Sequence, residues 1–371
     1  MRFIFLILAL ILFNQGISSA AVTAMVDNSY YNSFSNGIRL KSNNDKILVC
    51  YRKGIDHVAL DASGKGSNAV VLYSISSGTT SSEQVIYTDS VYDMRDCSLG
   101  EIYNPNTGVY TIYAFASRRC YSGGCSGTMV DWGYMKSTDG GVTWSTYNSV
   151  FTNDGIYMES FNGRGSMIDS NTAGTYYMPF FGHEEPTDTN WEVRLIGTTD
   201  YGATWDQNVL VYTGTTKLGE PAFAHVGNGE MFGLFRNNAN GVLRYSSSRD
   251  NGATWTTPVV SNIGGTNINI PFINYDKNYD DVIISYHDRQ SSGSAKYITS
   301  TRAKLALSGA TVFGSPTTLD TGYTANGYPW NVRISDTQVM FGWDKQTASD
   351  NADIMYDIVN IGTANQKLIM K

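Results

Sequence analysis

Charge, proline and histidine are all scarce in this sequence. Lys and Arg number 26 and Asp and Glu 33, so charged residues make up 16% of 371 and the formal net charge is −7. A disordered polymer would carry more charge and fewer aromatics than the 13% found here. The acidic balance argues against a general nucleic-acid binder, because neutralising phosphate requires a basic surface. The composition therefore predicts a folded protein with a large core.

Long apolar runs are also lacking, with one exception at the N-terminus. Phe3–Phe13 is eleven apolar residues long, preceded by Arg2 and followed by the small residues Ser18–Ala21. A membrane-spanning helix needs about 20 apolar residues, whereas a secretory signal peptide has this pattern. We predict a signal peptide over residues 1–20 and a single mature domain over 21–371. The mature protein would be secreted, extracellular or periplasmic, without a membrane anchor.

The chain has only four cysteines and no Cys-x-x-Cys or zinc-type spacing. In an oxidising compartment the four can pair. Cys120 and Cys125 enclose a short glycine-rich loop and suit a local disulfide, which would leave Cys50 to pair with Cys97. Free thiols are the alternative for a cytoplasmic protein.

A short frame, Ser/Thr-x-Asp-x-Gly-x-Thr-Trp, occurs at 137–144, 198–205 and 248–255. Asp and Ser/Thr hydrogen-bond the backbone of their own turn, Gly supplies a positive φ, and Thr-Trp re-enters a strand. Repeats of about 50–60 residues mark stacked supersecondary units. The segments between them are short, rich in β-branched and aromatic residues, and lack a long helical period. We predict an all-β, six-bladed propeller whose units begin near residues 33, 96, 157, 218, 268 and 326.

These turns in a propeller resemble the Asp boxes of the sialidase (neuraminidase) superfamily. In sialidases the boxes lie away from the active site, so we interpret their aspartates as structural. The segment Gly219–Trp255 is more specific, because it resembles the sialidase run of a Glu, a strand, a Gly turn, a strand ending in Arg, and an Asp box. The resemblance implies a glycoside hydrolase that cleaves α-linked sialic acid from glycoconjugates or from oligo- or polysialic acid.

The same resemblance implies three catalytic residues. Glu220 matches the glutamate that hydrogen-bonds the nucleophilic tyrosine, and Tyr328, at the start of the last unit, matches that tyrosine. Asp56 resembles the acid/base aspartate. Sialosides carry a carboxylate on the anomeric carbon, so a neutral tyrosine avoids the repulsion that a carboxylate nucleophile would meet. Asp56 would then protonate the leaving oxygen.

Arginine forks onto carboxylates and stays protonated, so arginines would bind the substrate. Arg236 and Arg289 resemble two members of the usual three-arginine cluster. The Phe-Arg-Ile-Pro motif that carries the third is missing, and Arg39 stands several residues too late. Arg95, within YDMRDC, could supply it.

Arg52 and His57, spaced Arg-x-x-x-x-His, resemble phage endosialidases, which cut α2,8-linked polysialic acid. Both residues are predicted to contact substrate, and exo versus endo action stays open. The following rivals for the catalytic roles also stay open: Tyr30 and Tyr31 for the nucleophile; Asp61, Asp93 and Asp96 for the acid/base, with Glu159 as a reserve acid.

Two patterns fail as metal motifs. His183-Glu184-Glu185 has no second histidine at helical spacing. Asp276, Asn278 and Asp280 alternate as in a calcium loop but lack its central Gly and terminal Glu, although a loop-bound calcium ion stays open. We expect no metal and no cofactor.

Other functions also stay open. A non-catalytic glycan-binding propeller is one, supported by the missing arginine motif, and a propeller hydrolase of another sugar with two facing carboxylates is another. A protein-interaction propeller is the last. The sialidase interpretation requires the proposed residues to converge at one mouth of the propeller.

Overall fold

All the regular elements in the described part of the chain are β-strands, as predicted, in this computed structural model. The described residues are 22–57, 65–120, 128–152, 165–170, 172–183, 189–263, 267–289, 293–301, 313–321, 327–348 and 351–361. The predicted signal peptide lies outside them. No described helix is long and apolar enough to cross a membrane.

Four of the sheets are separate and four-stranded. One orders β10 (Asn148–Thr152), β9 (Thr128–Ser137), β8 (Val109–Cys120) and β7 (Asp93–Asn104). The next contains β11 (Ile168–Asp169), β12 (Tyr176–Gly182), β13 (Trp191–Thr198) and β14 (Gln207–Gly214). The third contains β15 (Leu218–Gly227), β16 (Glu230–Asn237), β17 (Leu243–Ser248) and β18 (Val259–Val260). The fourth contains β19 (Ile268–Asp276), β20 (Asp281–Asp288), β21 (Ser294–Thr301) and β22 (Thr317–Thr321).

The remaining strands form one nine-stranded sheet that joins the two ends of the chain. Its early members are β1 (Thr23–Val26), β2 (Tyr31–Arg39), β3 (Lys46–Gly54), β4 (Ser67–Ser74), β5 (Thr79–Thr80) and β6 (Gln84–Tyr87). Its late members are β23 (Trp330–Arg333), β24 (Gln338–Ala348) and β25 (Asn351–Asn360). The two groups meet where β1 pairs with β25 and where Tyr31 of β2 pairs with Ala352 in parallel.

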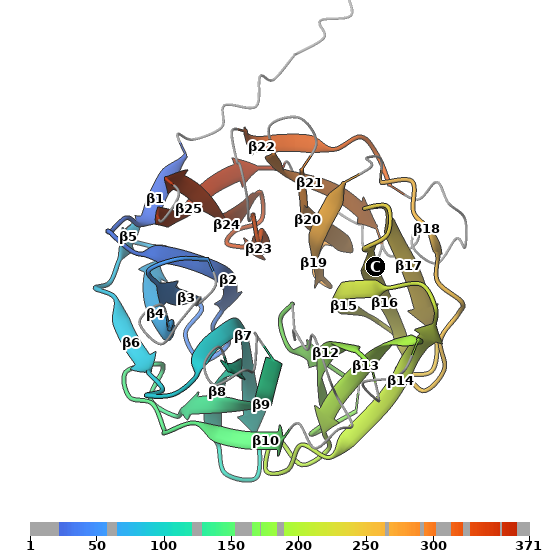
Figure 1. Cartoon of the computed structure of the whole chain (residues 1–371), viewed down its shortest axis with the longest axis horizontal. Helices are drawn as coiled ribbons and strands as arrows, with labels where there is room; N and C mark the ends of the chain where they lie inside the picture. Colours follow the sequence, from blue (N-terminus) through green and yellow to red (C-terminus); the bar gives the residue numbers. More distant parts are fainter. Residues whose placement is uncertain are drawn as a thin grey trace, which may run out of the picture.

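The sheets stand around a common axis, which makes the molecule a β-propeller (Figure 1). β2, β7, β15, β19 and β23 lie nearest the centre (Figure 1). β15 and β19 begin at residues 218 and 268, where units were predicted to begin. The predicted count of six separate blades is not confirmed, because the described strands form four four-stranded sheets and one larger sheet.

The three Asp boxes form locally stapled turns, as predicted. In the third, Ser248 Oγ donates to Asp250 (2.7 Å), and Thr254 donates to the same carboxylate through its N–H (2.8 Å) and its hydroxyl (2.6 Å). Gly252 has a positive φ of 88° and donates its N–H to Ser248 Oγ. The boxes of Asp139 and Asp200 repeat these side-chain bonds. The box aspartates are thus occupied in holding their own turns.

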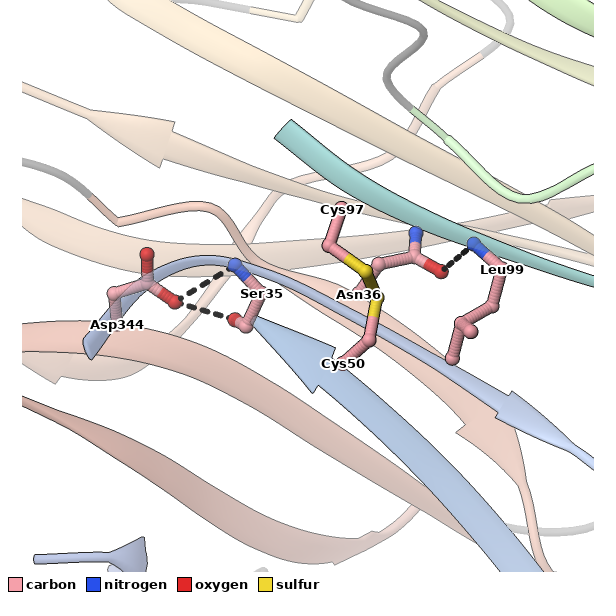
Figure 2. Close-up of a disulfide and its surroundings, with 6 residues drawn as sticks. All are labelled: Ser35, Asn36, Cys50, Cys97, Leu99 and Asp344. Carbon is pink, nitrogen blue, oxygen red and sulfur yellow. Dashed lines mark hydrogen bonds between the residues drawn. A yellow bond between two sulfur atoms is a disulfide. The ribbon is translucent and has the colours of Figure 1, made fainter. Parts of the chain in front are cut away.

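The core lies between neighbouring sheets. Phe115 and Trp132 stack with ring centroids 5.0 Å apart, and Trp132 meets Phe180 of the next sheet edge-on at 4.5 Å. A disulfide joins Cys50 of β3 to Cys97 of β7, as predicted, and so links two sheets covalently (Figure 2). Cys120 is also disulfide-bonded, and its predicted partner Cys125 lies outside the described residues.

Candidate active site

One end of the propeller, which we call the site end, is where the innermost strands begin and the second strands finish. Strand pairing places Arg52 of β3 opposite Ser33 of β2, and Arg236 of β16 opposite Gly219 of β15. In the β19–β20 pair the corresponding register position is His287, opposite Asn269. The sheet geometry therefore brings Arg52 and Arg236 to equivalent positions at the same end.

Four innermost strands carry a β-bulge at this end, each with a non-glycine residue in the left-handed region. The residues and their φ angles are Phe34 (59°), Asp96 (61°), Glu220 (46°) and Ile270 (53°). Bulges re-aim side chains, and a non-glycine residue with positive φ costs on the order of 1–3 kcal/mol. Phe34, Asp96 and Ile270 line one pocket together with Tyr328. The bulges therefore direct side chains from several sheets toward one place.

Polar side chains hold these bulges through hydrogen bonds to other strands. Asp344 of β24 accepts hydrogen bonds from the N–H groups of Phe34 and Ser35, the latter at 3.2 Å, and from the Ser35 hydroxyl. The Asn36 side chain accepts from the N–H of Leu99 at 3.1 Å. Figure 2 shows the Ser35 and Asn36 bonds on either side of the Cys50–Cys97 disulfide. These contacts join residues far apart in the sequence.

Glu220 bridges two sheets. One carboxylate oxygen lies 3.2 Å from Nη1 of Arg236, and the other accepts the N–H of Ile270 at 3.0 Å. The side chain of Glu220 is 12% exposed and that of Arg236 is 20% exposed, so a ligand can reach the pair from one side. Tyr328 is not among the hydrogen-bond partners of Glu220 within the described residues, but it shares a buried cluster with Ile270 and Phe34.

Phe34 is the meeting point of three predicted site residues. Its ring stacks on His57 (centroids 5.2 Å apart, planes at 27°) and lies 4.6 Å from the ring of Tyr328. The guanidinium carbon of Arg95 lies 4.5 Å from the Phe34 centroid, within cation–π range. Phe34 thus gathers His57, Arg95 and Tyr328 at the pocket, near the place where the missing arginine motif would stand.

Arg52, which was predicted to contact substrate, is fully buried and bonded to other parts of the protein. Its side chain has no exposed area, its Nε lies 2.9 Å from Asp93, and its Nη1 donates to the backbone oxygen of Asp56 at 2.7 Å. Asp93 also accepts the N–H of Gly66 at 2.6 Å. The Asp93 carboxylate, a rival for the acid/base role, is therefore engaged in a buried ion pair that fixes the backbone of Asp56.

Arg236 and Arg289 both lie near His287. Burial, followed by the positive charge of Arg289, lowers the pKa of His287 to about 4, and the charge of Arg236 acts in the same direction. The Nε atoms of both arginines are buried and have no hydrogen-bond partner among the described residues. Buried donors normally have a hydrogen-bond partner, so these two N–H groups are available to donate to a bound anion.

The other predicted residues are placed as follows. Asp96 lines the pocket, and its carboxylate lies 3.8 Å from Arg119. Tyr31 is buried with its ring 5.7 Å from His57, whereas Tyr30 is 40% exposed and lies under the ammonium of Lys53. Arg39 bonds the backbone of Asn44, which is 2.7 Å from its Nε. Asp61, Glu159, Glu184 and Glu185 lie outside the described residues.

Within the described ranges, no group of three or more His, Cys, Asp or Glu side chains is arranged so that it could hold a metal ion. Within the rejected calcium-like segment, Asp276 accepts the N–H of Asn278 and pairs with Arg333 at 3.0 Å. Tyr275 donates its hydroxyl to Asp280.

Sequence reasoning missed four residues that shape the site: Phe34, Ile270, His287 and Asp344. Phe34 and Ile270 read as ordinary strand residues, because the sequence does not show where a bulge falls. His287 stands where a calcium loop starting at Asp276 would have its terminal Glu, and nothing else in the sequence marks it. The polar Ser33-Phe34-Ser35-Asn36 stretch was a usable signal, since polar neighbours around an aromatic are unusual in a buried strand.

Comparison with known proteins extends this picture. The sequence is 31% identical to a sialidase from Paraclostridium sordellii over 39% of this chain and 42% of that protein, so the match spans less than half of its length. A protein of unknown function from Dyadobacter fermentans has a similar structure, with a TM-score of 0.77 and 18% identity over 94% of this chain and all of that one. A mutant of the NanB sialidase from Streptococcus pneumoniae follows with a TM-score of 0.67 and 10% identity, covering 93% of this chain and 70% of that one.

The structural likenesses, at such low identity, support the propeller fold alone. The BNR repeat-like domain family matches residues 66–341, which include all three Asp-box turns. That span is most of the chain. The chain therefore belongs to the BNR repeat-like domain family, within the sialidase superfamily that its Asp boxes resemble.

Proposed function

We propose that this protein is a secreted sialidase-type glycoside hydrolase that releases α-linked sialic acid from glycoconjugates or from oligo- or polysialic acid. The observation that carries the proposal is the convergence of Glu220, Arg236 and Tyr328 on the Ile270 bulge and its surroundings at the site end. Membership of the sialidase superfamily supports the reaction class.

Arg236 and Arg289 would bind the substrate carboxylate. Their buried Nε atoms have no partner among the described residues, and a carboxylate placed between them would satisfy both. Charge-assisted bonds of this kind are roughly twice as strong as neutral ones. Arg95, held over Phe34, is proposed as the third cation. His57 would contact the sugar or the leaving group. Arg52, which is fully buried, would act by fixing the backbone of Asp56.

Tyr328 is the proposed nucleophile and Glu220 the group that polarises it. Glu220 accepts a hydrogen bond from Ile270, and Tyr328 lines the same pocket as Ile270. Asp56 is the proposed acid/base, and it precedes His57, whose ring stacks on the pocket residue Phe34. Asp96 is the alternative acid, and its place in the pocket beside Tyr328 favours testing it in parallel.

The wider organisation is proposed on the same basis. One parallel residue pair, Tyr31 with Ala352, and the pairing of β1 with β25 join the early and late strands of the nine-stranded sheet. Dividing the sheet there gives two blades, and with the four separate sheets we infer six. Residues 1–20 are proposed to direct export, and residues 21–371 to form the single domain.

The test is release of sialic acid by the mature protein from a fluorogenic α-sialoside and from α2,8-linked oligosialic acid. Arg236→Ala and Glu220→Gln run beside the wild type, with Arg249→Ala, in the Asp box at the other end, as the matched control. Release from the small glycoside that both site variants lose, and the control keeps, would support exo action. Shortening of the oligomer alone would support endo action.

Absence of release from both substrates would overturn the proposal. If ligand binding persisted and Arg236→Ala abolished it, the protein would be a glycan-binding propeller. If the protein is active, Asp56→Asn and Asp96→Asn distinguish the two candidates for the acid. Only replacement of the true acid should lower kcat more on a substrate with a poor leaving group than on one with a good leaving group.

A further inference from the structure

His287 lies beneath the backbone that carries Tyr328. It is 1% exposed on β20 and pairs in register with Asn269, next to the Ile270 bulge. A Cβ atom on Gly327 would lie 2.7 Å from Cγ of His287 and 3.0 Å from its Cδ2, closer than side chains approach one another. The imidazole is therefore in van der Waals contact with the residue that precedes Tyr328.

The side chain at this place has to be uncharged. Arg289 and Arg236 lie near enough to lower the pKa of His287, and Asp288 opposes them only in part. In the two sheets discussed above, the equivalent register position is an arginine, Arg52 or Arg236. A third arginine here would add a cation and a longer side chain where Gly327 approaches. A neutral imidazole adds no cation beside the two arginines, and it is short enough to fit against Gly327.

We propose that His287 is a positioning residue, which sets the place of Tyr328 by packing against Gly327. This inference rests on the function proposed above, in which Tyr328 is the nucleophile. The contact limits where the backbone of Tyr328 can lie, while the ring of Tyr328 packs against Phe34 with centroids 4.6 Å apart. It also requires glycine at position 327 for space alone, since Gly327 is not among the residues with positive φ.

The experiment is a pair of compensating substitutions. Gly327→Ala adds a methyl group against the ring, and we expect kcat to fall by about 100-fold, as misplacement of a reacting group by about 1 Å does. KM should change little, because Arg236 and Arg289 still bind the carboxylate. His287→Ala with Gly327→Ala removes the obstacle, and we expect kcat to recover by about tenfold or more from the single variant. Gly314→Ala, where a Cβ would meet nothing within 4 Å, is the control.

Crystal structures of Gly327→Ala and of the double variant give a readout that does not depend on activity. Tyr328 should be displaced in the first and return in the second. An unmoved Tyr328 in Gly327→Ala, or a double variant no better than the single one, would overturn the inference. If the wild type releases no sialic acid, the proposed function fails, while the two structures still decide whether His287 positions Tyr328.

Should Gly327→Ala fail to fold, His287→Ala alone decides. Removal of the ring loosens Tyr328, and we expect kcat to fall about tenfold with KM close to that of the wild type. Unchanged kcat would show that the ring does not position the tyrosine. His287→Gln, a neutral side chain of similar reach, should restore part of the loss.

Discussion

The two ends of this propeller are held together in opposite ways. At the Asp-box end, each turn is closed by hydrogen bonds between residues two to four positions apart, as around Asp250. At the site end, the bonds join residues 310, 63 and 50 positions apart, from Asp344 to Phe34, Asn36 to Leu99 and Glu220 to Ile270. The first end can form turn by turn, whereas the second exists only once the sheets are assembled.

The ends also differ in what they leave unsatisfied. The box aspartates are surrounded by donors, and the Thr side-chain hydrogen bonds are the largest cause that lowers the pKa of Asp139 and Asp250 to about 2. At the site end, strained bulges and buried Nε atoms of Arg236 and Arg289 remain. Non-glycine residues with positive φ also occur in turns at the Asp-box end, such as Tyr201 and Asn251, whereas those at the site end lie within strands, as bulges. The buried Nε atoms at the site end are cationic donors, and a bound anion would supply their missing partners.

The sharpest test of this difference is Tyr328→Phe. Removing the hydroxyl of a covalent nucleophile should lower kcat by about 10³-fold or more without a comparable loss of stability. Kinetics on a fluorogenic sialoside, with thermal unfolding in parallel, measures both. Tyr103→Phe, at an exposed site on β7, is the control. Retained kcat would remove Tyr328 from its role and direct attention to Tyr31.

Asp93→Ala should destabilise the site end by about 3–5 kcal/mol, because it leaves the fully buried guanidinium of Arg52 without its carboxylate. Chemical denaturation monitored by tryptophan fluorescence gives the value. Asp169→Ala removes the partner of Lys41 in an exposed ion pair and should change stability by less than about 1 kcal/mol. Equal losses in the two variants would contradict the burial argument.

The Cys50–Cys97 disulfide should contribute about 2–4 kcal/mol, since it closes a loop with a separation of 47 residues. The double variant Cys50→Ala/Cys97→Ala should therefore unfold at lower denaturant concentration than the wild type without reductant. Adding reductant should lower the stability of the wild type by more than that of the variant, which has only the disulfide of Cys120 left to lose. A variant as stable as the oxidised wild type would show that the bridge adds no stability.

The smallest effect is expected at the Asp boxes. Asp250→Ala should lower Tm modestly and leave kcat unchanged, because the turn lies at the far end from the pocket. The folded-state pKa of about 2 lies below the ordinary 3.8, so the carboxylate stabilises the fold above pH 4. That contribution fades as the pH falls from about 4 to 2, and the Tm difference between wild type and variant should shrink over the same range. A gap that widens in acid would contradict this account.

The difference between local contacts at the Asp-box end and long-range contacts at the site end explains what could be predicted from the sequence. The Asp-box staples were predictable because Asp250 and its donors lie within one turn. The pairing of Cys50 with Cys97 followed from the short spacing of the other two cysteines. Arg95 and His57 were named, but not the ring of Phe34 that gathers them, because a bulge depends on strand register. The partners of Glu220 were predicted in part: Arg236 was placed in the same site, but the bond to Ile270 depends on how two sheets meet.

The pairing of β25 with β1 and β2 has a consequence for the order of folding. Thr23 pairs with Tyr356, and Tyr31 with Ala352, so the first sheet of the ring includes strands made last. During synthesis the early strands wait for the whole chain, and contacts of such long separation slow folding. The ring therefore closes only after β25 has been synthesised, and until then the edge of β2 is open to pairing with another chain.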